Sequence, residues 1–195
     1  YLPQTSQKFM REISLHILDI LQNSVAAGAD VIRTDICFDS GSGLLKIDIA
    51  DNGCGMDEET LARVTDPFMT SRTTRKVGLG IPLYKFYATL TGGGFDIRSK
   101  PGEGTKVSAV FNTKSIDCMP VGNLTDAILT TISSNHDIRF IFTFAVDGKS
   151  FEFDTDDVKD VLHDQNGYCD LTVYFHIREF IAGKIKEVNG GKLQL

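Results

Sequence analysis

Two pairs of short alternating strands limit the folds that the first 113 residues can adopt. VIRTDICF and LLKIDIA alternate apolar and polar side chains and are separated by DSGSG, which predicts a hairpin. FDIRSK and TKVSAVF, joined by PGEG, predict a second hairpin. A sheet built from two such hairpins has to be covered by helices that pack on it.

Three helical segments flank these hairpins. Thr5 or Ser6 is predicted to cap a first helix that runs to about Ala27, because Gly28 is a natural terminator. MDEETLARV predicts a short helix opened by acids, which suit a helix N-terminus. IPLYKFYATLTG predicts a third helix, with Pro82 in the first turn. The order helix, two strands, helix, loop, helix, two strands predicts a sheet with helices on one face.

The character of the chain changes from about residue 112. NLTDAILTTISS predicts a helix, and IRFIFTFAV and SFEFD flank the tight turn DGK, with two helical segments after them. We therefore divide the chain into a first domain, residues 1–113, and a small α+β domain, residues 114–195. Residues 114–195 hold 8 Lys/Arg and 13 Asp/Glu, so most of the net charge of −6 belongs there. This acidity argues against broad binding to nucleic acid or to an anionic membrane.

The remaining composition predicts a cytoplasmic protein. No apolar run approaches the roughly 20 residues that a membrane helix needs. The first residues lack the apolar stretch of a signal peptide. The four cysteines have no metal-ligand spacing, so free thiols are expected.

DIADNGCGM combines a buried strand with a sharp turn. Asp51 ends the strand, and Gly53 and Gly55 follow in the turn. One interpretation is an ordinary connection from strand to helix. The other is that Asp51 accepts a hydrogen bond from a ligand amine while the two glycines let the backbone approach the ligand.

RTTRKVGLGIPL places two glycines directly before a helix. Gly78 and Gly80 lead into the helix, whose free amides and dipole form an anion site. The preceding cations are ones that a polyphosphate would attract: Arg72, Arg75 and Lys76. The alternative is a flexible basic loop on the surface.

Residues 12–111 resemble the ATP-binding domain shared by DNA gyrase, the large heat-shock chaperone, mismatch-repair proteins and histidine kinases, which is called the Bergerat fold. Its four motifs occur in order, as DILQNSVAAGA, DNGCGM, PFMTSRTTRKVGLGI and GEGT. The resemblance implies the α+β class: a two-layer sandwich of a mixed sheet with helices on one face, here followed by a small α+β region. It also implies ATP and Mg²⁺ as cofactors.

The resemblance assigns roles to individual residues. Asn23 would hold Mg²⁺ together with waters. Asp51 would bind the adenine amino group, supported by Thr105 and Gly55, partly through water. Lid amides would wrap the phosphates. The residues implied to contact the nucleotide are Asn23, Asp51, Gly53, Gly55, Met56, Arg72, Gly78, Leu79, Gly80 and Thr105, while Ser24 and Asn52 would line the site without chemistry.

Asp19 is the candidate general base. In ATP-hydrolysing members and in serine-kinase anti-sigma factors this position holds Glu, and in many histidine kinases it holds Asn. Asp19 is able to act as a general base, since proton abstraction requires only a carboxylate within hydrogen-bond reach, but its side chain is one methylene shorter than that of Glu. A shortfall of about 1 Å can cost on the order of 10²-fold in rate, so slow turnover is expected. His16, one turn earlier, either orients Asp19 or is an ordinary buried or surface histidine.

Two features of the C-terminal part, its aromatic side chains and an acidic run, each allow two interpretations. The aromatic side chains of residues 138–153 and 174–185 fit core packing, and a partner-binding surface is the alternative. The acidic run DTDDVKD fits a helix N-terminus, and a metal site is the alternative.

These patterns support two functional hypotheses. In the first, the chain is a Mg-ATP-binding regulatory protein that acts as a kinase in trans, on histidine or serine, or as a slow ATPase. Self-phosphorylation is not expected, because only about a dozen residues precede the ATP-binding motifs, where kinases of this family carry the acceptor histidine. In the second, ATP gates a protein-binding module without turnover. Both need a protein partner, and both leave a homodimer open.

Overall fold

The computed structural model of the chain describes residues 12–65, 80–162 and 171–195. Six strands form one sheet in the order β3-β4-β2-β1-β5-β6. The strands are β1 Val31–Asp39, β2 Leu44–Asp51, β3 Gly94–Lys100, β4 Gly104–Asn112, β5 Arg139–Val146 and β6 Lys149–Asp154. The helices are α1 Ile13–Ala26, α2 Glu58–Val64, α3 Gly80–Leu90, α4 Leu124–Ser134, α5 Thr155–Leu162 and α6 Leu171–Asn189.

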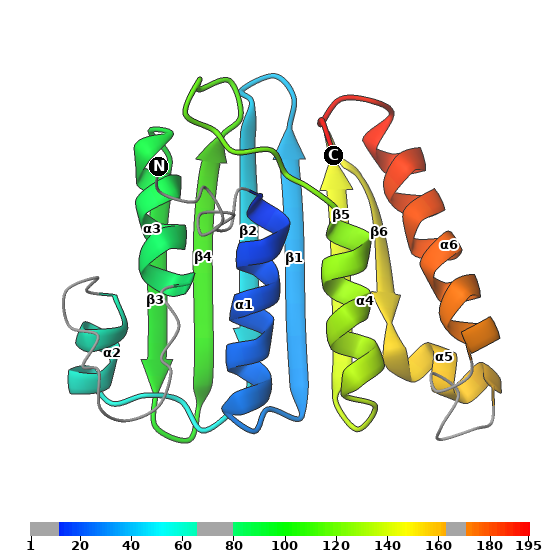
Figure 1. The fold of residues 1–195 in the computed structure, drawn as a ribbon, viewed down its shortest axis with the longest axis horizontal. Coiled ribbons are helices and arrows are strands. Elements are labelled where there is room, and N and C mark those ends of the chain that lie inside the picture. Colours follow the sequence, from blue (N-terminus) through cyan, green and yellow to red (C-terminus); the bar gives the residue numbers. More distant parts are fainter. Residues whose placement is uncertain (1–11, 66–79, 163–170) are drawn as a thin grey trace, which may run out of the picture.

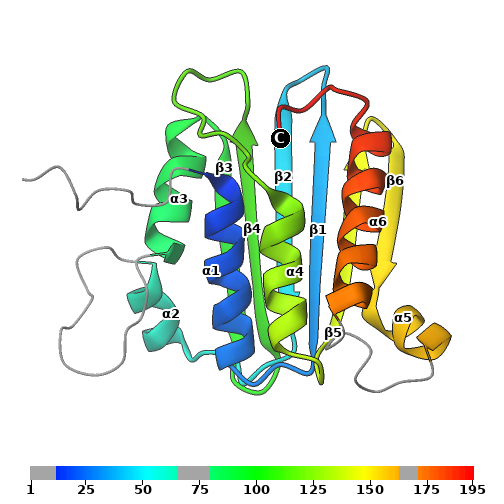
Figure 2. The same ribbon diagram turned by 45° about the vertical axis from the view of Figure 1, so that its right-hand side comes forward.

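The longer helices cover one face of the sheet (Figures 1 and 2). α1, α3, α4 and α6 lie side by side on that face. The short helices α2 and α5 lie near the two outer strands, α2 by β3 and α5 by β6. The sheet is mixed because β1 pairs with β2 in the antiparallel sense and with β5 in the parallel sense. The predicted α+β class, a mixed sheet with helices on one face, is confirmed.

Each predicted hairpin is present at the predicted turn. β1 and β2 pair up to Asp39 opposite Leu44, and β3 and β4 pair up to Lys100 opposite Gly104. The third hairpin turns through Asp147 and Gly148, which both have positive φ, of 50° and 83°. Two consecutive residues with positive φ form the turn that matches the twist of paired strands.

The predicted boundary at residues 113 and 114 falls in the connection between β4 and α4. Strands from both sides of it are hydrogen-bonded in one sheet, because β5 runs beside β1 from Val31 opposite Arg139 to Phe38 opposite Val146. One apolar core also includes side chains from both ranges. The division into two domains stays a prediction.

The start of α1 differs from the predicted one. The predicted cap, Thr5 or Ser6, lies outside the described residues, and the helix begins at Ile13 after an extended Glu12. The amides of Ile13 and Ser14 donate to the carbonyls of Pro120 and Val121, at 3.0 and 2.8 Å. The prediction of the cap was therefore wrong, because a distant chain segment satisfies these amides instead of a local side chain. The predicted end is confirmed, since Gly28 has φ +71°.

The core lies between the helices and the covered face of the sheet. α1 buries Ile13, Ile17 and Leu21 against it, and its C-terminal turns expose Asn23. The aromatic side chains of β5 pack into the same core, which confirms core packing for that strand. On α6, by contrast, Phe175 and Phe180 are half exposed.

The acidic run at the end of β6 forms a helix start. α5 begins at Thr155 with Asp156 and Asp157 in its first turn, as predicted. Within the described ranges, no cluster of three or more His, Cys, Asp or Glu side chains could hold a metal ion. The same ranges contain no helix that is both long and apolar enough to cross a membrane.

Candidate functional site

Asp51 is the last residue of β2, and hydrogen bonds fix its carboxylate from two sides. Oδ2 accepts a bond from the Ser24 hydroxyl on α1 at 2.7 Å. Oδ1 accepts from the backbone amides of Gly53 and Thr105, at 2.9 and 3.2 Å. Ser24 is buried, so this carboxylate joins α1, β2 and β4 at one end of the sheet. Sequence reasoning placed Ser24 in the site but missed this role.

Two glycines let the turn after Asp51 pack tightly. Gly55 has φ +65°, and a Cβ added there would lie 1.9 Å from the Lys100 carbonyl oxygen. A Cβ on Gly53 would lie 2.9 Å from both Cβ and the carbonyl oxygen of Ala27. The glycines therefore let this turn approach the protein's own backbone. Their predicted contact with a ligand stays a prediction.

Ser99 of β3 connects the turn to the start of β4. Its hydroxyl accepts a bond from the Met56 amide at 2.8 Å and donates to the Gly104 carbonyl at 2.9 Å. It also lies 2.9 Å from the Thr105 hydroxyl. Sequence reasoning missed Ser99, although the hairpin register around PGEG places it opposite Thr105.

Replacing Ser99 with alanine is expected to lower the free energy of unfolding by about 1–2 kcal/mol, because the Met56 amide loses its partner in a partly buried position. Urea unfolding of the variant measures this change. Ser150→Ala is the matched control, since Ser150 is exposed on β6. Equal stabilities of the two variants would contradict a structural role for the Ser99 hydroxyl.

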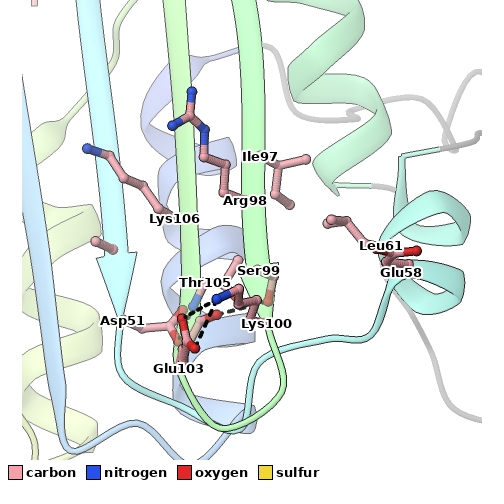
Figure 3. Close-up of a pocket in the computed structure, with 12 residues that line it drawn as sticks. Asp51, Glu58, Leu61, Ile97, Arg98, Ser99, Lys100, Glu103, Thr105 and Lys106 are labelled. Carbon is pink, nitrogen blue, oxygen red and sulfur yellow. Dashed lines mark hydrogen bonds and ion pairs between the residues drawn. The ribbon is translucent and has the colours of Figure 1, made fainter.

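A cavity of about 620 Å³ lies at this end of the sheet (Figure 3). Asp51, Ser99 and Thr105 lie together there, and Leu61 and Glu58 lie across from them on α2. Its lining consists of Ala50, Asp51, Glu58, Leu61, Ile97, Arg98, Ser99, Lys100, Glu103, Gly104, Thr105 and Lys106. Of the predicted site residues that the structure describes, Asp51 and Thr105 line this cavity. The others do not: Asp19, Asn23, Gly53, Gly55, Met56 and Gly80.

Asp19 and Asn23 lie one turn apart on α1. Asn23 is exposed, whereas Asp19 is partly buried. Burial raises the pKa of the Asp19 carboxyl above its usual value, and the neighbouring Asn23 side chain opposes that rise. Oδ2 of Asp19 is buried and has no hydrogen-bond partner among the described residues.

Two further polar side chains of this region contribute to the fold. His16 is buried, and its ring lies 5.7 and 5.6 Å from the rings of Tyr84 and Tyr87, which favours its interpretation as a core histidine. The Asn52 side-chain oxygen accepts bonds from the amides of Asp30 and Val31, both at 2.9 Å. Asn52 therefore fixes the start of β1 next to the Asp51 turn.

The predicted lid is only partly covered by the structure. Arg72, Gly78 and Leu79 lie outside the described residues. Gly80 is described, and it is the buried first residue of α3. Their contacts with phosphate stay predictions, as does every other assignment of a residue to the nucleotide.

Several curated bacterial proteins are similar to this chain, and some of them are named as kinases. The "Non-motile and phage-resistance protein" of Caulobacter vibrioides is 33% identical over 116 residues, which are 55% of this chain and 14% of that protein. The sensor protein kinase FleS of Pseudomonas aeruginosa is 36% identical over 95 residues, 49% of this chain and 23% of that protein. The histidine protein kinase DivJ of Caulobacter vibrioides is 31% identical over 106 residues, 52% and 17% respectively. The chain thus spans less than a quarter of the length of each of these relatives.

The family model covers the residues that build the site. Residues 10–115 match the family described as "Histidine kinase-, DNA gyrase B-, and HSP90-like ATPase". This range is more than half of the chain and contains α1, the Asp51 turn and both hairpins of the first 113 residues. It confirms the resemblance stated from the four motifs. The chain belongs to the histidine kinase-, DNA gyrase B- and HSP90-like ATPase family.

Proposed function

We propose that the chain binds Mg-ATP and acts as a regulatory kinase on a partner protein, at histidine or serine, or as a slow ATPase. The observation that supports this best is the Asp51 carboxylate, which is fixed by Ser24, Gly53 and Thr105 in a chain of an ATPase family. The histidine kinases among the similar proteins support phosphoryl transfer. The partner and its acceptor residue are to be found by experiment.

Asp51 is proposed to accept a hydrogen bond from the adenine amino group. Oδ2 receives one bond from Ser24, and a carboxylate oxygen can accept a second. Because the surrounding bonds hold the carboxylate in place before the ligand arrives, little conformational freedom is lost on binding. Thr105 and Gly55 are proposed to support this contact, partly through water.

Asn23 is proposed to hold Mg²⁺. Magnesium keeps several waters and needs only one or two protein oxygens beside those of the phosphates, so the exposed side-chain amide of Asn23 fits it. A bound Mg²⁺ would neutralise charge on the phosphates. Ser24, the neighbour of Asn23, is bonded to Asp51, which connects the proposed metal and adenine positions through two adjacent residues.

Asp19 is proposed to be the general base. Its position one turn before Asn23 places a carboxylate beside the proposed metal ligand, and the Asn23 side chain favours the charged form of that carboxylate. Arg72, Gly78, Leu79 and the first amides of α3 are proposed to contact the phosphates, since a helix N-terminus favours an anion. The short side chain of Asp19 makes slow turnover the expectation.

One observation favours the alternative of a binding module without turnover. The Asp19 Oδ2 atom is buried, whereas a general base has to reach the proton that it removes. In such a module ATP would order part of the chain and change a protein-binding surface.

Incubation of the purified protein with γ-labelled ATP and Mg²⁺ distinguishes these functions. Labelled free phosphate is the expected result for an ATPase, and label on an added partner is the expected result for a kinase. Bound ATP that stays intact supports the module. EDTA in place of Mg²⁺ is the control and is expected to remove turnover, because the phosphate charge is no longer neutralised. Absence of ATP binding at millimolar nucleotide would contradict the whole proposal.

A further inference from the structure

The start of α3 and the Asp19 side chain occupy adjoining space. A Cβ added to Gly80 would lie 1.6 Å from Oδ2 of Asp19, 2.5 Å from its Cγ and 3.3 Å from its Cβ. Real Cβ atoms essentially never come within 3.0 Å of a heavy atom outside their own residue and its two chain neighbours. The Asp19 carboxylate therefore fills the volume that a side chain at position 80 would need.

We propose that Gly80 is a positioning residue for Asp19, and that its missing side chain lets the carboxylate lie against the first turn of α3. The sequence predicted a different role for Gly80, contact with phosphates through the lid. The effect of this positioning on catalysis rests on the proposed function, in which Asp19 is the base.

The surroundings leave the two residues little room to adjust. α1 and α3 lie side by side on the sheet (Figures 1 and 2), and Gly80, Ile81 and Pro82 are all buried at the start of α3. On α1, Ile17 and Ile20 are buried on either side of Asp19 in sequence. A methyl group at position 80 would thus have to move either a packed helix or the Asp19 side chain, and the side chain is the softer of the two.

Displacement of the carboxylate has a chemical consequence. Clearing the contact requires the Asp19 oxygen to move by more than 1 Å, since it lies 1.6 Å from the added Cβ. A shift of about 1 Å in a catalytic group costs on the order of 10²-fold in rate. The adenine contacts of Asp51 lie on a separate element and would be unaffected.

A cycle of four full-length proteins tests the inference: wild type, Gly80→Ala, Asp19→Ala and the double variant. Asp19→Ala removes the two atoms that clash and leaves only Cβ, at 3.3 Å from the new methyl group. Gly80→Ala alone is expected to lower the melting temperature by about 5 °C, as overpacking does. In the Asp19→Ala background the same change is expected to leave the melting temperature unchanged or raise it, because alanine favours the helix over glycine.

Gly183→Ala is the matched control. Gly183 lies within α6, and a Cβ added there meets nothing within 4 Å. This change is expected to raise the melting temperature slightly in either background and to leave turnover unchanged. It shows what a helical glycine-to-alanine change does when no neighbour is displaced.

Measurements of ATP affinity and turnover distinguish a positioning role of Gly80 from a role in binding the phosphates. For Gly80→Ala we expect turnover of the folded protein to fall about 10²-fold, and ATP affinity to fall much less, because alanine keeps the backbone amide that is proposed to contact phosphate. An equal loss of thermal stability in both backgrounds would overturn the inference, and so would a loss of ATP affinity that persists in the Asp19→Ala background. If the wild type binds no ATP, the proposed function fails, but the stability cycle still decides whether Gly80 makes room for Asp19.

Discussion

Asp19→Asn is expected to reduce turnover of ATP by about 10²-fold or more, which is the usual contribution of a general base. The amide keeps the size of the side chain and its contact with the start of α3, but it cannot take a proton. The rate of phosphate release or transfer at saturating ATP measures this effect. ATP affinity is expected to change little, because the proposed adenine contact is made by Asp51 on β2.

The same variant is expected to unfold at a higher temperature than the wild type. Oδ2 of Asp19 is buried without a hydrogen-bond partner among the described residues, and a buried charge in that state opposes folding. Asp117→Asn is the control, since Asp117 is exposed in the connection after β4. Unchanged turnover in Asp19→Asn would show that Asp19 is not the base. Turnover that is absent from the wild type as well, with ATP tightly bound, would favour the module.

Asp51→Asn is expected to weaken ATP binding by roughly 10- to 100-fold, since a hydrogen bond to a charged group contributes about 1.5–3 kcal/mol. The asparagine oxygen has to face the Gly53 and Thr105 amides, because both donate to Oδ1 in the wild type. The NH₂ group then takes the place of Oδ2 and opposes the adenine amino group, donor against donor. Isothermal titration calorimetry with ATP and Mg²⁺ measures the loss.

Inosine triphosphate makes this experiment specific to the base. It carries an oxygen where adenine carries the amino group, so the wild type should bind it more weakly than ATP. In Asp51→Asn the preference for ATP should disappear. If the variant keeps its preference, Asp51 does not contact the amino group. A fall in thermal stability large enough to unfold the variant would be seen in its circular dichroism spectrum.

Most elements of the sheet could be predicted because their signals are local. Alternation and turn residues lie within a few positions of each other, as in the third hairpin, where Asp147 and Gly148 adopt the positive φ values that their turn needs. The start of α1 could not be predicted in this way. Its first amides are bonded to Pro120 and Val121, more than 100 residues further along the chain, so a search for a nearby capping side chain led to the wrong residues.

The site residues divide in the same way, into those that lie in short sequence motifs and those whose contacts depend on strand register or helix packing. Asp51 and Thr105 lie in short motifs, and the structure brings them together at 3.2 Å between Oδ1 and the amide. The role of Ser99 depends on strand register, which fixes it opposite Thr105. The contact of Gly80 with Asp19 depends on how two helices pack, which no local pattern records. Arg72, Gly78 and Leu79 lie outside the described residues, so their part in the site rests on sequence alone.

The parallel pairing of β5 with β1 has a consequence for any shortened form of the chain. A fragment that ends with the family match at residue 115 would leave the nine residues of β1 as an outer strand with unsatisfied amides and carbonyls. It would also remove α4, which packs against α1, and an exposed outer strand is the feature that recruits other chains into aggregates. In the 195-residue chain the outer strand on this side of the sheet is β6 instead. β6 is shorter and carries Lys149, Glu152 and Asp154. We therefore expect the segment beyond the family match to keep β1 from pairing with other chains.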